Sequence, residues 1–225
     1  SSDKKPGVTP PPNPLQDPYS GAIALTFPLA DGAYHKSLRD GWHDNRVGDF
    51  AGSWSHQNST TQRAHDGVDI FPQSAKALPT VYAPLAARVA AVCVGGVYTQ
   101  NRDAVIAPPW SYPAGTGADN IYGNYLWLYS TELGSLGYFA FYCHLQDDGL
   151  LRAVAAELVS GSDAVGVSTA VGTMGDTGNA AGQPQLHVEL HYPRGNSFQC
   201  ARCAPAKGGM TAFNPFPSLS RATLR

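Results

Sequence analysis

Two short segments of the chain carry residue types that together form the ligand set of a catalytic zinc ion. The first, RAHDGVDIF, contains His65 and Asp69, and the second, PQLHVELHY, contains His187. Two imidazoles and one carboxylate leave the fourth tetrahedral position open for water, which the metal makes nucleophilic near neutral pH. The two segments therefore predict a Zn²⁺-dependent hydrolase, provided that the three side chains meet in space.

Alternation within the second segment places His187 on a polar face. Between positions 185 and 191 the odd residues are polar and the even residues are apolar, which is typical of a β-strand with one face in a core. Side chains two positions apart lie about 6.5 Å apart along a strand, so Gln185 or Glu189 can line a metal held by His187. Glu189 can accept a hydrogen bond from the ligand imidazole, although we favour an exposed carboxylate at a strand edge.

His65 and Asp69 also share one face of an extended segment, with Gly67 between them. A residue without a side chain leaves room for an ion at this point. On its own, H-x-x-x-D is a weak signal, and a surface histidine near a surface aspartate is the simpler interpretation. The joint occurrence with His187 is what favours a metal site.

Further motifs occur in the order in which a known family has them. Between FPL at 27–29 and FNPFPSL at 213–219 the chain contains HDGVDI (65–70), TVYAPLAARVAAV (80–92), YGNYLWL (122–128), YCHL (142–145), VGTMGDTGNAAG (171–182) and QLHVEL (185–190). With these motifs the chain resembles the lysostaphin-like (LytM-type) zinc peptidoglycan endopeptidases over most of its length. The resemblance implies a zinc metalloendopeptidase that hydrolyses peptide bonds in the stem peptides or cross-links of peptidoglycan.

The resemblance also assigns roles to single residues. It implies that His65, Asp69 and His187 are the zinc ligands and that His144, in YCHL, is a catalytic histidine beside the metal. The family has a second catalytic histidine two positions before the last ligand, where this chain has Gln185. An amide can donate and accept hydrogen bonds but cannot shuttle a proton, and a general acid or base contributes about 10²–10⁴-fold in rate.

Gln185 therefore leaves more than one function open. We favour a working hydrolase of reduced activity, in which Gln185 orients water or a substrate carbonyl and His144 transfers the proton. The alternative is a zinc-binding but catalytically silent module that binds wall peptides or regulates another wall hydrolase. A β-rich binding protein without a metal is the third possibility.

Composition and charge agree with one enzyme domain. The chain has 225 residues, 43% of them hydrophobic, which is enough for a complete core. Fifteen Lys and Arg against 17 Asp and Glu give a net charge of −2, which gives no reason to propose nucleic acid or an anionic membrane as a partner. No apolar run approaches the roughly 20 residues of a membrane span. We expect a monomer, and a wall substrate implies export to the periplasm, cell envelope or extracellular space.

The expected architecture is a mostly β, compact antiparallel sheet or sandwich with a zinc site in a surface groove and one or two short helices. We expect a Pro-rich linker or processed segment at 1–21, the peptidase domain at 22–219 and a tail at 220–225. The elements expected within the domain are a strand pair at 80–94 with a bend near Pro84, a hairpin of strands at 125–130 and 137–143, a helix at 149–159, a turn at 171–182 and a long irregular loop at 95–124.

Four cysteines allow two disulfides. Cys200 and Cys203 form a C-A-R-C pair, which in an exported protein favours a local disulfide over half of a structural zinc site. Cys93 and Cys143 lie in expected strands. They are either bonded to each other, which we favour, or buried thiols.

Overall fold

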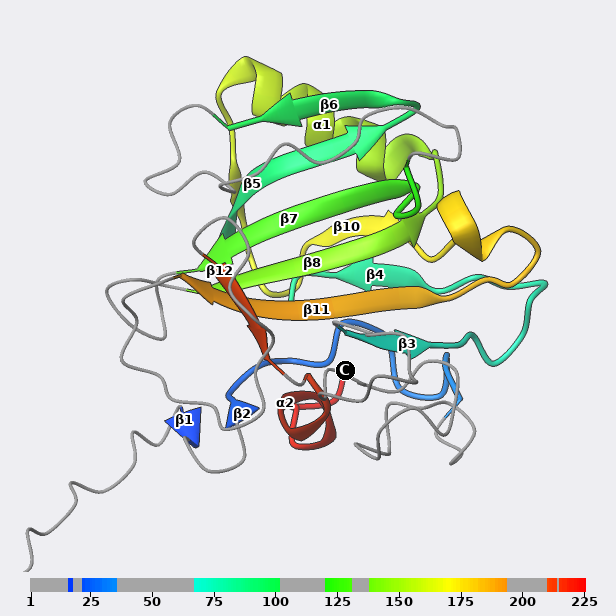
Figure 1. Cartoon of the computed structure of the whole chain (residues 1–225), viewed down its shortest axis with the longest axis vertical. Helices are drawn as coiled ribbons and strands as arrows, with labels where there is room; N and C mark the ends of the chain where they lie inside the picture. Colours follow the sequence, from blue (N-terminus) through cyan, green and yellow to red (C-terminus); the bar gives the residue numbers. More distant parts are fainter. Residues whose placement is uncertain are drawn as a thin grey trace, which may run out of the picture.

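The structure is a computed structural model that describes residues 16–17, 22–35, 67–101, 120–130, 138–193, 210–213 and 215–225. The mostly β, antiparallel fold predicted from the sequence is confirmed in this part of the chain (Figure 1). Its central sheet consists, in spatial order, of β12 (Met210–Phe213), β11 (Leu186–Pro193), β8 (Tyr138–Leu145), β7 (Asn124–Ser130), β5 (Ala87–Val94) and β6 (Val97–Gln100). Two short strands complete it, β3 (Val68–Ile70) beside β11 and β9 (Ala164–Val165) beside β5.

The inner strands of the sheet bury both of their faces. In β7, Leu126 and Leu128 point into the main core, whereas Tyr125 and Trp127 belong to a second, aromatic cluster on the opposite face. Alternation of this kind, with aromatic residues on one side, favours strands over helices. The predicted hairpin of β7 and β8 is confirmed, since the two strands pair antiparallel.

A second layer covers the face of the sheet that carries the main core. It contains a small sheet of β4 (Thr80–Tyr82) and β10 (Ala170–Thr173), the helix α1 (Gly149–Ser160), the segment 22–35 and the short helix α2 (Phe216–Ser220). The predicted helix is thereby confirmed. Asp148 caps its start through hydrogen bonds to two backbone N–H groups, and Gly161 ends it in the left-handed conformation.

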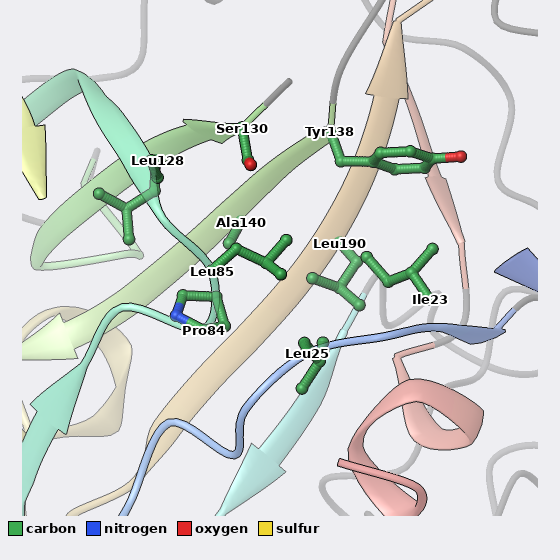
Figure 2. A pocket seen from close by; sticks show the side chains of 10 residues that line it. Ile23, Leu25, Pro84, Leu85, Leu128, Ser130, Tyr138, Ala140 and Leu190 are labelled. Carbon is green, nitrogen blue, oxygen red and sulfur yellow. The ribbon is translucent and has the colours of Figure 1, made fainter. Parts of the chain in front are cut away.

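The segment 22–35 packs against the face of the sheet that carries the main core. In Figure 2, Ile23 and Leu25 of this segment lie beside Leu190 of β11 and Ala140 of β8. The cavity between them measures about 10 Å³, close to the smallest volume that holds one water molecule. Its apolar lining and size indicate a packing gap in the core.

Both ends of the described chain pack on the domain. The two-residue strand β1 (Gln16–Asp17) pairs with β2 (Ala22–Ile23). Arg225 donates hydrogen bonds of 2.8 Å to the carbonyl oxygens of Phe27 and Ala83, and its guanidinium lies 4.5 Å from the ring centroid of Tyr82. Hydrogen bonds to backbone carbonyls and the cation–π contact hold the C-terminal residue against the segment 22–35 and the end of β4.

The expected irregular loop at 95–124 is partly wrong. Its first residues form β6, which pairs with β5 through the two-residue turn Gly95–Gly96, and both glycines have positive φ. Two glycines between β-branched and aromatic residues are the sequence signal for such a hairpin. Residues 102–119 lie outside the described part.

The preferred disulfide between Cys93 and Cys143 is also wrong. Both are buried thiols, Cys93 on β5 and Cys143 on β8, and β7 lies between these strands. Two strand spacings are about 10 Å, which exceeds the Cα separation of about 7 Å that a disulfide can bridge. Cys200 and Cys203 lie outside the described residues. No helix in the described part is long and apolar enough to cross a membrane.

Candidate active site

Antiparallel pairing of β3 with β11 brings two of the predicted ligands together. Asp69 is the direct partner of His187 in this register, and the Asp69 Oδ1 and His187 Nδ1 atoms lie 2.8 Å apart. Both side chains are buried. These two residues, 118 positions apart in the sequence, therefore lie in direct contact, and their role as zinc ligands stays a prediction. His65, the third predicted ligand, lies outside the described residues.

Gly67 makes the close approach of β3 and β11 possible. A Cβ atom at this position would lie 2.4 Å from the backbone oxygen of Val188 and 2.9 Å from the His187 Cε1 atom. Contacts this short do not occur for real Cβ atoms. The room expected at Gly67 is thus taken up by the strand β11 and by the His187 ring itself.

Glu189 and His191 continue the polar face of β11 beyond His187. The His187 Nε2 atom lies 2.8 Å from Glu189 Oε1, and the His191 Nε2 atom lies 2.5 Å from Glu189 Oε2. The preferred interpretation of Glu189 as an exposed edge carboxylate is wrong, because β11 has β8 on one side and β3 and β12 on the other, and Glu189 is only 5% exposed. Its hydrogen bond with the imidazole of His187, the other interpretation, is present.

These contacts shift the pKa values of the buried groups. Burial lowers the pKa of His187, but hydrogen bonds to Asp69 and Glu189 outweigh it and raise this pKa to about 10. Burial raises the pKa of Glu189, but hydrogen bonds from His187 and His191 outweigh it and lower this pKa to about 2. Asp69 and Glu189 are thus two hydrogen-bond acceptors for one imidazole. Because a neutral imidazole has only one N–H group, either a second proton or a cation must lie between Asp69 and His187.

A β-bulge turns His144 toward His187. Asn124 of β7 pairs with Leu145 of β8, and Leu126 pairs with Tyr142, so β8 has one extra residue in this interval. His144 has φ of +63°, a left-handed conformation that few residues other than glycine adopt. Regular alternation would aim its side chain at the main core with that of Tyr142; instead its ring centroid lies 6.0 Å from that of His187.

The hydrogen bond of the His144 Nδ1 atom determines where the ring carries its proton. Nδ1 lies 2.8 Å from the backbone oxygen of Thr177. A carbonyl oxygen only accepts hydrogen bonds, so Nδ1 must carry the proton. In the neutral ring, Nε2 is then the basic nitrogen, as a general base requires.

Thr177 is itself held in place by the first residue of β7 and the last residue of β8. Its hydroxyl accepts a hydrogen bond of 3.0 Å from the Asn124 backbone N–H and donates one of 2.9 Å to the Leu145 oxygen. Gly123, with φ of +65°, lies so close that a Cβ atom would be 2.3 Å from the Thr177 hydroxyl. The residue that fixes the His144 ring is therefore part of a tightly packed junction between the turn at 120–123 and the segment 171–182.

Gln185 immediately precedes the ligand strand β11. Its backbone N–H donates a hydrogen bond of 3.0 Å to the Gly175 oxygen, and the residue is half-buried. A Cβ atom at Gly175 would lie 2.7 Å from the His144 backbone oxygen. Gly175 thus links the backbone that precedes His187 to the bulge at His144. The catalytic role expected for Gln185 stays a prediction.

Cys143 adjoins the site without the properties of a nucleophile. It pairs with His187 across β8 and β11. Burial, and then the negative charges of Glu189 and Asp69, raise the pKa of its thiol well above the ordinary value. A thiol in such surroundings stays protonated and unreactive.

The two donors that the structure describes are of the types that bind zinc. Asp69 and His187 supply the oxygen and nitrogen that zinc takes in proteins. The His187 Nε2 atom faces a carboxylate, as the outer nitrogen of a metal-bound histidine commonly does. Within the described ranges, no three His, Cys, Asp or Glu residues are arranged to hold a metal, so a complete site needs a donor such as His65 from beyond them.

Fold and site together define a mostly β domain with a buried carboxylate–imidazole centre. No protein-family model matches the chain, and no curated protein matches its sequence. A solved structure titled "Identification and structural characterization of LytU" is similar over 80% of this chain and 88% of that chain, with 15% identity and a TM-score of 0.38. Values this low do not define a shared activity, so the case for function rests on the residues of the site.

Sequence reasoning missed two polar residues of this site. His191 has the same strand parity as His187, and this parity could have placed it beside Glu189. Thr177 lies in VGTMGDTGNAAG, which is expected to be a turn before the ligand strand, although its first residues belong to β10. Nothing in this segment signals that the Thr177 backbone oxygen meets His144.

Proposed function

We propose that the chain is a zinc-dependent hydrolase that cleaves peptide bonds in peptidoglycan stem peptides or cross-links. The observation that supports this most is the buried Asp69–His187 pair, with the His144 ring 6.0 Å from that of His187. A buried carboxylate and two imidazoles drawn from three strands have little value for stability alone, because burying charge costs free energy. The peptidoglycan substrate rests on the sequence resemblance.

Each residue has a distinct role in this proposal. Asp69, His187 and His65 hold the metal. When bound, zinc supplies a Lewis acid that polarises a carbonyl and lowers the pKa of water. His144, with its proton on Nδ1 and a basic Nε2, accepts a proton from the attacking water and returns one to the leaving amine. Gln185 orients water or the substrate carbonyl through its amide.

Gln185 favours a second candidate, a module that binds zinc and wall peptides without cutting them. Loss of one of two proton-transfer groups lowers the rate by about 10²–10⁴-fold, and a bound zinc with a correctly oriented His144 still leaves slow turnover. We favour the enzyme because the His144 tautomer is fixed by a dedicated contact with Thr177. A wall substrate in turn places the protein outside the cytoplasm, in the periplasm, cell envelope or medium.

Two measurements test the proposal together. The zinc content of the purified protein is measured in His65→Ala, His187→Ala and His144→Ala, and the peptides released from purified peptidoglycan are measured by mass spectrometry. We expect the first two variants to lose zinc and the third to keep zinc but lose peptide release. Full zinc occupancy in His187→Ala would refute the ligand assignment.

A Gln185→His variant separates the two candidates. Release of peptides by the unmodified chain, raised further in the variant, supports the enzyme. Release only by the variant supports the silent module. Zinc absent from every variant and from the unmodified chain would contradict both.

A further inference from the structure

We propose that Glu189 and His191 form a positioning pair that holds the His187 imidazole with its Nδ1 atom toward Asp69. This inference rests on the proposed function, because it names the residues that prepare His187 to bind the metal. Neither residue touches substrate in the proposal; both act through His187.

The pair follows from the geometry of one strand. His187, Glu189 and His191 alternate along β11 and point to the same face of the sheet. The two oxygens of Glu189 meet different imidazoles, Oε1 at 2.8 Å from His187 and Oε2 at 2.5 Å from His191. Glu189 thus uses both oxygens to join the two rings.

The environment keeps this arrangement away from water. Glu189 is 5% exposed and His191 is 4% exposed. The His191 ring meets the Trp127 ring edge to face at 5.0 Å, and Trp127 stacks on Phe141 at 4.1 Å. In such surroundings a carboxylate needs donors, because burying an unpaired charge is strongly unfavourable. His191 supplies the second donor that keeps Glu189 buried and ionised.

A carboxylate is the right partner because it only accepts hydrogen bonds. Glu189 therefore takes the hydrogen bond of the His187 Nε2 atom and leaves the Nδ1 atom directed away from it. Nδ1 is the atom that faces Asp69. An amide at position 189 lacks this selectivity, since its NH₂ group can also donate to a ring nitrogen, so it no longer fixes the orientation of the ring.

The test combines zinc affinity with a measurement that needs no zinc. Zinc affinity is measured by competition with a chelator in Glu189→Gln, Glu189→Ala and His191→Phe, and Glu157→Gln is the control because Glu157 lies exposed on α1. Side-chain ¹H–¹⁵N spectra of the zinc-free protein report whether the His187 Nε2 atom carries a hydrogen-bonded proton. Thermal unfolding shows that each variant is folded, and Glu189→Gln, which keeps the shape of the side chain, remains informative if Glu189→Ala does not fold.

We expect the variants at 189 and 191 to bind zinc about 10–100-fold more weakly, with Glu157→Gln unchanged. We also expect a hydrogen-bonded Nε2 proton on His187 in the unmodified protein that is shifted or lost in Glu189→Gln. Affinities for zinc within about twofold of the unmodified protein in both folded Glu189 variants would overturn the inference. If the unmodified protein binds no zinc, the proposed function fails, and the presence or absence of the His187 Nε2 signal still decides the positioning role.

Discussion

Replacing Gly67 with alanine tests whether the close contact of β3 and β11 builds the site. An added Cβ atom would lie 2.4 Å from the Val188 backbone oxygen, whereas ordinary contacts begin at 3.4 Å. The obstacle is backbone in the middle of a sheet, so β3 has to retreat by about 1 Å, and the Asp69–His187 contact of 2.8 Å then exceeds hydrogen-bond distance.

The free-energy cost has two parts. Overpacking at a rigid position costs about 1–3 kcal/mol, and a lost hydrogen bond between charged groups costs about 1.5–3 kcal/mol. We therefore expect Gly67→Ala to lower the free energy of unfolding by about 2.5–6 kcal/mol. For a chain of this length, that corresponds to a melting temperature lower by about 5–24 °C.

The measurement is thermal unfolding followed by calorimetry or circular dichroism, together with the zinc content. The matched control is Gly149→Ala at the start of α1, where an added Cβ atom meets nothing within 4 Å. We expect the control to melt at or slightly above the temperature of the unmodified protein, because alanine favours a helix. If Gly67→Ala melts with the control and keeps its zinc, the reasoning from the strand contact is refuted.

Two further predictions concern the residues around the site and the sheet. Thr177→Val removes the two hydrogen bonds of the hydroxyl that hold Thr177 in place beside His144. We expect this variant to be less stable by about 1–2 kcal/mol and to release peptides more slowly at unchanged zinc content, whereas Thr177→Ser should restore stability and rate. Equal rates of peptide release in the two variants would contradict this prediction. Asp163 accepts hydrogen bonds from Arg88, which lower the pKa of its carboxyl, so its stabilisation is complete above the unfolded pKa near 3.9 and is lost as the pH falls through the lower folded pKa. Asp163→Asn should therefore cost about 1 kcal/mol at neutral pH in denaturant titrations, and the difference should shrink below about pH 4; a difference independent of pH would exclude this role.

Periodicity was sufficient to predict the elements that carry the site. The alternation around His187 placed the residue on a strand with one apolar face, and the structure has this strand as β11. The aromatic hairpin and the helix at 149–159 were predictable for the same reason, because their patterns repeat at periods that only one type of element satisfies.

Strand order was not predictable in this way. The expected Cys93–Cys143 disulfide required β5 and β8 to be neighbours, but β7 pairs with both and separates them. Alternation predicts which face of the sheet a residue occupies, but it does not predict which strand is the neighbour. The prediction that Glu189 is exposed was wrong for the same reason, because the sequence does not show that β11 has partner strands on both sides.

His144 is the clearest example of a side chain for which the local sequence pattern predicts the wrong face of the sheet. Counting along YFAFYCHL puts His144 on the core side with Tyr142, and nothing in these residues marks a bulge. What turns the ring around is assembled from elsewhere: the Tyr122 oxygen accepts the His144 N–H at 2.9 Å, and the Thr177 oxygen accepts from Nδ1. A left-handed histidine costs about 1–2 kcal/mol of backbone strain, which the contacts from two distant segments offset. The strained backbone of His144 and the contacts that stabilise it thus position the ring beside His187. Strained backbone conformations are often found at functional sites.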